Sequence, residues 1–284
     1  MLHFFDVFFM CFCFPARDSH ITQLAAVCGG EKFSTYILPR KPITRKASEI
    51  TGIEVVNGKM FCRNKEVNAV NISDGLDAFL NFLSSFQTKV ILVGHNIKSY
   101  DCHLLLNALE SCNRTNVVSQ HVEGFVDTKM LFKIYDSSLK CYTQESLFKH
   151  FVSSEYNVHD ALEDVLALQK LIRHLDIDVS ACIFSDVSFT FLNAFECWKY
   201  CSEVRKNVPT LNDLISEHVV SKGMANKIAG SGLNFSCLKL AYTRNPHDGI
   251  YNLLSEKVRN SIRVTKSQRV IHSLNKYFAT LCEI

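Results

Sequence analysis

The sequence predicts an α/β domain with a mixed β-sheet flanked by helices, followed by a mainly helical C-terminal region. Runs rich in β-branched and aromatic residues come first in the chain, which favours strands there. Helical periodicities then alternate with a continuous apolar run at Val90–Val93, which is typical of a strand buried on both faces. After Asp178 only helical patterns remain. An apolar content of 47% with 21% charged residues indicates a globular protein with a sizeable core.

The elements of the first region follow from their periods. Strands are predicted at His3–Phe9, Ile21–Val27, Phe33–Leu38, Val90–Val93 and Gly124–Val126. Helices are predicted at Ile43–Ile53, Gly75–Phe86, Tyr100–Leu109, Gln144–Phe151 and Val158–Leu175. Val55–Val70 has no clear period, which favours a loop or a small hairpin.

The second region is expected to begin near residue 177, so that residues 1–176 form the α/β domain and residues 177–284 the helical region. Its helices are predicted at Phe191–Val204, Thr210–Val220, Met224–Ile228 and Tyr251–Phe278. The last of these contains six lysines and arginines, with Glu256 as its only acid. Such a face can contact phosphates or simply lie in water, and both interpretations stay open.

The bulk composition excludes some classes of protein. The 12 cysteines are scattered without a CxxC pair, so no zinc site is predicted. Scattered thiols indicate a reducing compartment, either the nucleus or the cytoplasm. Met1–Phe14 is apolar, but it lacks the features of a signal peptide and is too short to span a bilayer, so no membrane partner is expected. The net charge of +3 is too small to decide for or against nucleic acid.

Three aspartates lie where a carboxylate is energetically unfavourable. Asp6 interrupts the apolar strand His3–Phe9, and Asp101 follows a strand end at the start of a helix. On a helical wheel at about 100° per residue, Asp164 falls inside the apolar face of its helix. A carboxylate that faces a core is disfavoured unless it is paired or binds a metal.

Each of these residues, and His159 near the start of the same helix, also has a purely structural explanation. Asp6 can lie on a solvated strand edge, and Asp101 can cap its helix. Asp164 can pair with a buried arginine or lysine, and His159 can be an ordinary surface residue. The case for a functional site comes from their occurrence together, in this order and at this spacing.

The motifs around these residues resemble those of the DEDDh family of 3′–5′ exonucleases, which includes ribonuclease T and the proofreading subunit of bacterial replicative polymerase. Val93–Asp101 resembles the second motif, and His159–Asp164 resembles the third, a histidine followed five residues later by an aspartate. Ile21–Val27, Ala47–Ile53 and Phe125–Thr128 are also similar to segments of these enzymes. The resemblance covers roughly residues 3–175 and implies a ribonuclease H-like fold.

The resemblance also implies an activity, a metal-dependent hydrolysis of phosphodiester bonds at DNA or RNA 3′ ends. Asp6, Asp101 and Asp164 would hold two Mg²⁺ or Mn²⁺ ions. His159 would take the proton from the attacking water. His95 and Asn96, inside the second motif, would contact the substrate.

The first motif of the family, Asp-x-Glu, is incomplete. Asp6-Val7-Phe8 has phenylalanine where the glutamate belongs, and phenylalanine cannot bind a hard cation. This predicts weak metal affinity and low activity. The rival interpretation is a catalytically inactive exonuclease-like module that binds nucleic acid or a protein.

The N-terminal segment has a second explanation. Phe8–Pro15 consists almost entirely of residues with pyrimidine-rich codons, as at the 3′ end of an intron, which suggests that residues 1–15 come from a mis-predicted gene start.

The order of an exonuclease-like domain and a helical extension also resembles the exonuclease-like C-terminal region of the promyelocytic leukaemia (PML) protein and its relatives in fish. The second metal ion is expected only if the first motif is intact.

Overall fold

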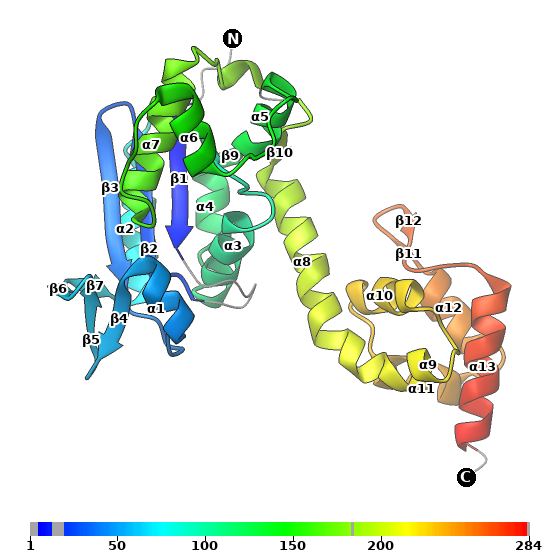
Figure 1. Cartoon of the computed structure of the whole chain (residues 1–284). Coiled ribbons are helices and arrows are strands. Elements are labelled where there is room, and N and C mark those ends of the chain that lie inside the picture. The colour runs from blue at the N-terminus through cyan, green and yellow to red at the C-terminus, as the bar shows by residue number, and fades with distance from the viewer. Residues whose placement is uncertain (1–4, 13–19, 183–184, 283–284) are drawn as a thin grey trace. The chain divides into compact units, whose positions relative to one another are not determined.

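A computed structural model of the chain describes residues 5–12, 20–182 and 185–282 (Figure 1). Its main feature is a seven-stranded mixed sheet. The strand order is β10 (Ser188–Thr190), β9 (Val122–Asp127), β8 (Val90–Gly94), β1 (Phe5–Phe12), β2 (Gln23–Cys28), β3 (Glu31–Ile37) and β7 (Ala69–Val70). Part of the segment assigned to a mis-predicted start, residues 1–4 and 13–15, lies outside the described residues.

The directions of the central strands decide at which edge of the sheet their carboxyl ends meet. β1 pairs antiparallel with β2, and β2 pairs antiparallel with β3. On its other side β1 runs parallel to β8, and β8 runs parallel to β9. The carboxyl ends of β1, β8 and β9 therefore meet at one edge. This confirms the mixed sheet predicted from the sequence.

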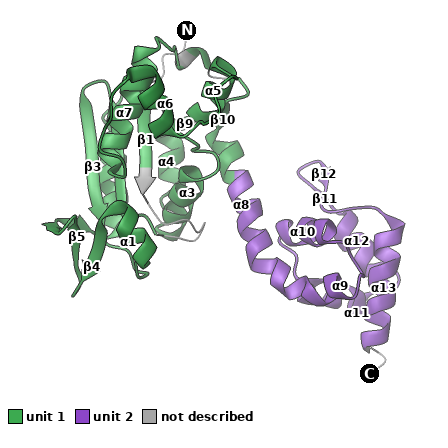
Figure 2. Ribbon diagram, viewed as in Figure 1, with its two compact units in different colours: residues 1–195 green, residues 196–284 purple. Residues whose placement is uncertain are grey.

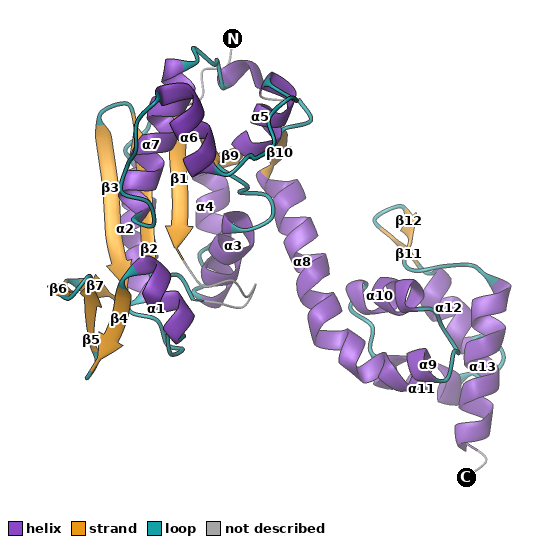
Figure 3. Ribbon diagram, in the orientation of Figure 1, coloured by secondary structure: helices purple, strands orange, loops and turns teal. Residues whose placement is uncertain are grey.

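Helices cover both faces of the sheet (Figure 3). The helices of the first unit are α1 (Arg45–Thr51), α2 (Ile72–Ser84), α3 (Asp101–Ser111), α4 (Thr115–His121), α5 (Thr128–Tyr135), α6 (Gln144–Val152), α7 (Ala161–His174) and the short η1 (Ser180–Cys182). Successive residues of a strand point to opposite faces. Phe8 accordingly joins the core formed with α7, whereas Phe9 packs on Phe79 of α2 with ring centroids 5.4 Å apart. Both faces of β1 are buried for this reason.

The segment without a clear period forms a small second sheet. Its strands are β4 (Ile53–Val56), β5 (Lys59–Cys62) and β6 (Lys65–Val67), paired antiparallel in this order. It follows α1, which begins at the capping Thr44 and ends at Gly52 in the left-handed conformation.

The first compact unit ends later than the boundary expected near residue 177. The chain divides into residues 1–195 and residues 196–284 (Figure 2). The reason is β10, which pairs antiparallel with β9 and extends the sheet. Phe189 stacks on Phe125 at 5.1 Å, and the backbone N–H of Asp127 donates to Val187.

The second unit is mainly helical, as expected. α8 (Phe191–Asn207) runs into it from the first unit, and the unit also contains η2 (Val208–Leu211), α9 (Asn212–Ser216), α10 (Lys222–Gly230), α11 (Phe235–Arg244), α12 (Gly249–Ser255), β11 (Lys257–Val258), β12 (Ser261–Ile262) and α13 (Gln268–Cys282). It has a core of its own, built around fully buried Leu214, Ile228, Leu274 and Phe278. No described helix is long and apolar enough to span a bilayer.

The prediction of one long helix over Tyr251–Phe278 is wrong. The helix ends at Ser255 and a two-stranded hairpin follows before α13 begins at Gln268. Arg259 and Asn260 form the turn of the hairpin with φ of +46° and +66°. Two successive left-handed residues give the turn that matches the twist of paired strands, and a helix cannot pass through them.

Replacing Gly124 by alanine should detach β10. An added Cβ would lie 2.5 Å from the carbonyl oxygen of Phe189, so β10 must move away, at a cost of about 1–3 kcal/mol. Limited proteolysis should then cut the segment between η1 and α8 much faster than in the parent protein.

The matched control is Gly30→Ala, because a Cβ at Gly30 meets nothing within 4 Å. Equal protection of the Gly124 variant and the parent would contradict a boundary set by β10.

Candidate active site

The loop that follows β8 is held by a buried aspartate at the end of β9. Asp127 is 3% exposed. Its carboxylate accepts hydrogen bonds from the backbone N–H groups of Asn96 at 3.0 Å and Lys98 at 3.2 Å. It also caps α5 by accepting from the N–H of Lys129 at 3.0 Å. These bonds fix the path by which the chain reaches Asp101, the first residue of α3.

The start of α7 is clamped onto the sheet by a second aspartate. Asp160 is the N-cap, and its Oδ1 accepts from the N–H groups of Leu162 and Glu163. Its Oδ2 accepts from Nε2 of Gln23 at 3.3 Å, and Oε1 of Gln23 accepts from the N–H of Ala161 at 3.0 Å. Because Gln23 belongs to β2, this clamp sets the position of the first turn of α7, which carries Asp164.

Asp164 is buried and lies beside other acids. It is 6% exposed, and burial raises its pKa to about 7, with smaller contributions from the negative charges of Asp160 and Asp101. The N–H of His159 and the hydroxyl of Tyr156 donate to its carboxylate and act in the opposite direction. Asp101 and Asp164, predicted from motifs 63 residues apart, are therefore brought together. Asp101 is itself 6% exposed.

Two of the predicted site residues have a left-handed backbone. Asn96 has φ of +61° and His159 has φ of +67°. For a residue with a Cβ this conformation costs about 1–2 kcal/mol. The bonds to Asp127 and to Asp164 hold these backbones in place. The His159 side chain is exposed at this edge, so its imidazole is accessible to a bound molecule.

His95 is engaged inside the protein. Its Nε2 lies 2.7 Å from the carbonyl oxygen of Tyr142 and must donate to it. Its Nδ1 lies 3.1 Å from the hydroxyl of Thr128. Burial lowers the pKa of His95, so the ring is neutral at pH 7 and its Nδ1 accepts from the threonine. Contact of these ring nitrogens with a substrate requires these bonds to break.

The structure does not bring Asp6 to this edge. Asp6 lies opposite Ile91, three residues before β8 ends at Gly94. Burial, with a smaller contribution from the charge of Asp178 beyond the C-terminal end of α7, raises its pKa to about 6. Asp164 lies in the first turn of that 14-residue helix, whose ends are about 20 Å apart. Asp6 therefore lies at a different level of the sheet from Asp164, and its role as a metal ligand stays a prediction.

The register of β1 shows which of its residues reach the edge. Phe12 pairs with Gln23, at the level where α7 begins. Met10, two positions earlier, packs against the core to which α7 contributes. Phe8 lies deeper, opposite Val93, and is 6% exposed. In this register, positions 10 and 12 of β1 lie nearer to the level where α7 begins than positions 6 and 8 do.

The donors at the edge fit one divalent cation with water as further ligands, and not two cations. Carboxylate oxygens are the ligands that Mg²⁺ prefers, and Asp101 and Asp164 supply two carboxylates. Oε1 of Gln144, whose amide donates to the carbonyl of Asp164 at 2.7 Å, is buried without a hydrogen-bond partner. Among the described residues, no group of three or more His, Cys, Asp or Glu side chains is arranged to hold a metal ion.

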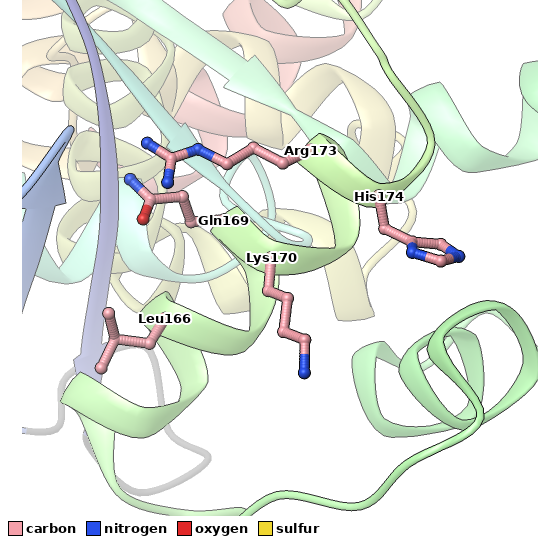
Figure 4. A pocket seen from close by; sticks show the side chains of 5 residues that line it. All are labelled: Leu166, Gln169, Lys170, Arg173 and His174. Atoms are coloured by element: carbon pink, nitrogen blue, oxygen red, sulfur yellow. The ribbon is translucent and has the colours of Figure 1, made fainter.

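A pocket of about 560 Å³ lies elsewhere, along the C-terminal half of α7. Figure 4 shows its lining side chains projecting from successive turns of this helix: Leu166, Gln169, Lys170, Arg173 and His174. Asp164 is not among them, so the hollow and the acidic edge are different places on the unit.

Four residues of the site were missed as functional residues in the sequence. Asp127 follows an apolar run that ends a strand, as Asp101 does, and this signal could have identified it. Asp160 was visible only as part of the third motif. Gln144 and Tyr156 carry no sequence signal, because their roles depend on contacts between α6, the loop after it and α7.

Comparison with known families agrees with this fold. Residues 18–158 match the Exuperantia RNAse H-like domain, and residues 207–281 match the PML C-terminal domain. These matches confirm the resemblance to ribonuclease H-like, exonuclease-type domains and to the PML type of C-terminal region. The first match begins after β1 and ends just before His159, so it includes Asp101 and Asp127 but not Asp164.

Solved structures of exonuclease I are also similar. One is described as suggesting how processivity is achieved, and it has 18% identity and a TM-score of 0.49 over 61% of this chain and 43% of its own. Another, of the Escherichia coli enzyme with a dT13 oligonucleotide, has 18% identity and a TM-score of 0.49 over 60% and 41%. The chain thus spans about two fifths of the length of these proteins. No curated protein matches the chain.

Replacing Asp6 by asparagine should flatten the pH dependence of stability. The folded pKa of about 6 lies above the ordinary value of 3.8, so the folded state binds more protons between these values. The free energy of unfolding therefore falls as the pH rises from about 4 to about 6. Because Asp6 is partly exposed, solvent screening limits this fall to about 1–2 kcal/mol.

Urea unfolding at several pH values between about 4 and 7, in the presence of EDTA, measures the difference between parent and variant. An identical slope in both proteins would show that the Asp6 carboxylate is solvated in the folded state.

Proposed function

We propose that this protein is a ribonuclease H-like exonuclease that removes nucleotides from DNA or RNA 3′ ends, with a rate limited by the acids missing from β1. The supporting observation is the convergence of two buried carboxylates, Asp101 and Asp164, beside an exposed histidine. They lie at the edge where three parallel strands end.

The residues of the edge suit the steps of this reaction. Asp101 and Asp164 would hold a Mg²⁺ or Mn²⁺ ion, which supplies stabilisation of the negative charge on the leaving 3′ oxygen. His159 would accept the proton of the attacking water, and the scissile phosphorus–oxygen bond would break as the new one forms. Asp127 and Asp160 act indirectly, because they position the loop before Asp101 and the turn that carries Asp164.

The pKa of Asp164 affects how tightly this edge would bind a metal ion. At about 7 without a cation, the carboxylate is half protonated near neutral pH. A bound cation must displace that proton. Metal affinity should therefore increase as the pH rises through 7.

A second candidate function is binding without hydrolysis, and the geometry of β1 favours it. Neither Met10 nor Phe12 is acidic, and Asp6 lies near the start of β1, away from the edge where this strand ends. Two carboxylates at this edge would be enough to bind the end of a nucleic acid through one metal ion. They would not be enough to position the water that attacks the phosphate. The scattered cysteines of the sequence support the nucleus or the cytoplasm as the place of either function.

The two functions are separated by incubating the protein with end-labelled single-stranded DNA and RNA in Mg²⁺ or Mn²⁺. Catalysis predicts shortening from the 3′ end that EDTA stops. His159→Ala and Asp164→Asn should each reduce the rate by about 100-fold or more, because one removes a general base and the other a ligand.

Asp6→Asn is the matched control, since it neutralises a half-buried carboxylate of the same sheet at a level away from the edge. It should keep the parent rate. Binding without shortening in both metals would support the second candidate.

Adding acids to β1 should raise the rate. Met10→Asp, alone and together with Phe12→Glu, places carboxylates at the level where α7 begins, and we expect an increase of about tenfold or more. Phe8→Glu should not help, because it buries a charge in the core and lowers the stability by about 3 kcal/mol or more.

Activity and urea unfolding of the three variants test this. A gain from Phe8→Glu with none from Met10→Asp would show that the register of β1 differs from the one described. Sequencing the transcript across codons 1–20 tests separately whether residues 1–15 come from a mis-predicted start.

A further inference from the structure

The excess of positive over negative charge belongs to the second unit. Residues 196–284 contain 13 lysines and arginines against 7 aspartates and glutamates. Residues 1–195 contain 18 against 21. The net charge of +3 for the whole chain therefore hides a basic unit of +6 joined to an acidic unit of −3. Such a division points to a polyanion as a partner of the second unit.

Within this unit one run of basic residues covers the hairpin β11–β12, the segment after it and α13. Six of them lie between Glu256 and Lys276, and Glu256 is the only acid there. Every residue from Glu256 to Ile262 is exposed, including Val258 at 43% and Ile262 at 44%. Figure 1 shows the hairpin standing away from α10 and α12. A two-stranded hairpin is only marginally stable alone. Packing against the rest of the unit does not explain why this hairpin is exposed.

One arginine anchors the hairpin and another stands at its tip. Arg263 donates to Glu256 at 2.8 Å and to the carbonyl of Ser231 at 3.3 Å, and its side chain is 24% exposed. Arg259, in the turn, pairs with Glu196 at 2.6 Å, with side-chain exposures of 79% and 50%. An ion pair this exposed is weak and is readily exchanged for another anion.

The remaining cations face solvent. Lys257, Lys266 and Arg269 are exposed, and no ion pair involves them in the described part of the chain. Arg269, His272 and Lys276 are exposed at spacings of three and four residues along α13, whereas Ile271, Leu274 and Phe278 are buried on its other face. The basic surface thus continues from the hairpin along one side of α13.

We propose that the hairpin β11–β12 and the exposed side of α13 form a nucleic-acid-binding surface that contacts the phosphate backbone without reading sequence. Phosphates attract lysine and arginine side chains spread along an elongated surface, and their binding releases counterions. A two-stranded ribbon is also narrow enough to enter the major groove of a duplex. This surface is separate from the acidic edge of the first unit and would serve either of the functions proposed for it.

Binding of the full-length protein to fluorescent single-stranded DNA, duplex DNA and RNA in EDTA tests the proposal, because EDTA excludes metal-dependent hydrolysis. The variant combining Lys257→Gln, Arg259→Gln, Lys266→Gln and Arg269→Gln should raise Kd at least tenfold at low salt. The slope of log K against log salt should decrease by about 3 to 4, since each lost phosphate contact contributes about 0.7 to 0.9.

The matched control combines Lys222→Gln, Lys227→Gln, Lys239→Gln and Arg244→Gln, which removes the same charge from exposed positions on α10 and α11. It should change Kd less than threefold. Glu196→Gln should have the opposite effect and lower Kd about twofold, because it frees Arg259.

Equal losses in the two fourfold variants would reduce the effect to overall charge and overturn the proposal. So would unchanged binding by the hairpin variant, or binding to phosphatidylserine vesicles but not to nucleic acid. Loss of nuclease activity in Asp164→Asn leaves this result untouched, so the two proposals fail or succeed separately.

Discussion

The parallel pairing of β1 with β8 is the constraint on which the rest of the first unit depends. It places β1 in the middle of the sheet, between β2 and β8, with Phe8 opposite both Val27 and Val93. A strand in that position is buried on both faces, by α7 on one and by α2 on the other. The same register decides which side chains of β1 lie deep in the core and which reach the edge where β8 and β9 end.

Hydrogen bonds to carboxylates organise that edge. Asp127 binds the loop after β8, and Asp160 binds the start of α7. Asp101 and Asp164, the two aspartates proposed to act in the chemistry, are both buried, and the charge of Asp101 acts on Asp164. Burial raises the pKa of Asp164, with smaller contributions from the negative charges of Asp160 and Asp101, and the proposed affinity for a divalent cation rests on the same group of acids.

The two units differ in electrostatic character. The first concentrates buried acids at one edge, whereas the second has an excess of exposed bases on a hairpin and a helix. The two proposals therefore assign contact with the phosphate backbone to the basic unit and action on a nucleic-acid end to the acidic one. Residues 207–281, within the second unit, are similar to the PML C-terminal domain.

Local patterns in the sequence were sufficient to predict the strands β2, β3 and β8 and the helix α7, because each contains a clear apolar pattern. The spacing of recognisable motifs also singled out Asp101, Asp164 and His159 as candidate site residues, and their roles stay predictions. Tertiary structure alone decided the place of Asp6, since an aspartate in an apolar strand gives no sign of its level in the sheet. It also decided the roles of Gln144 and Tyr156 and the break between α12 and α13, because these depend on contacts between segments far apart and on two left-handed turn residues that a helical pattern conceals.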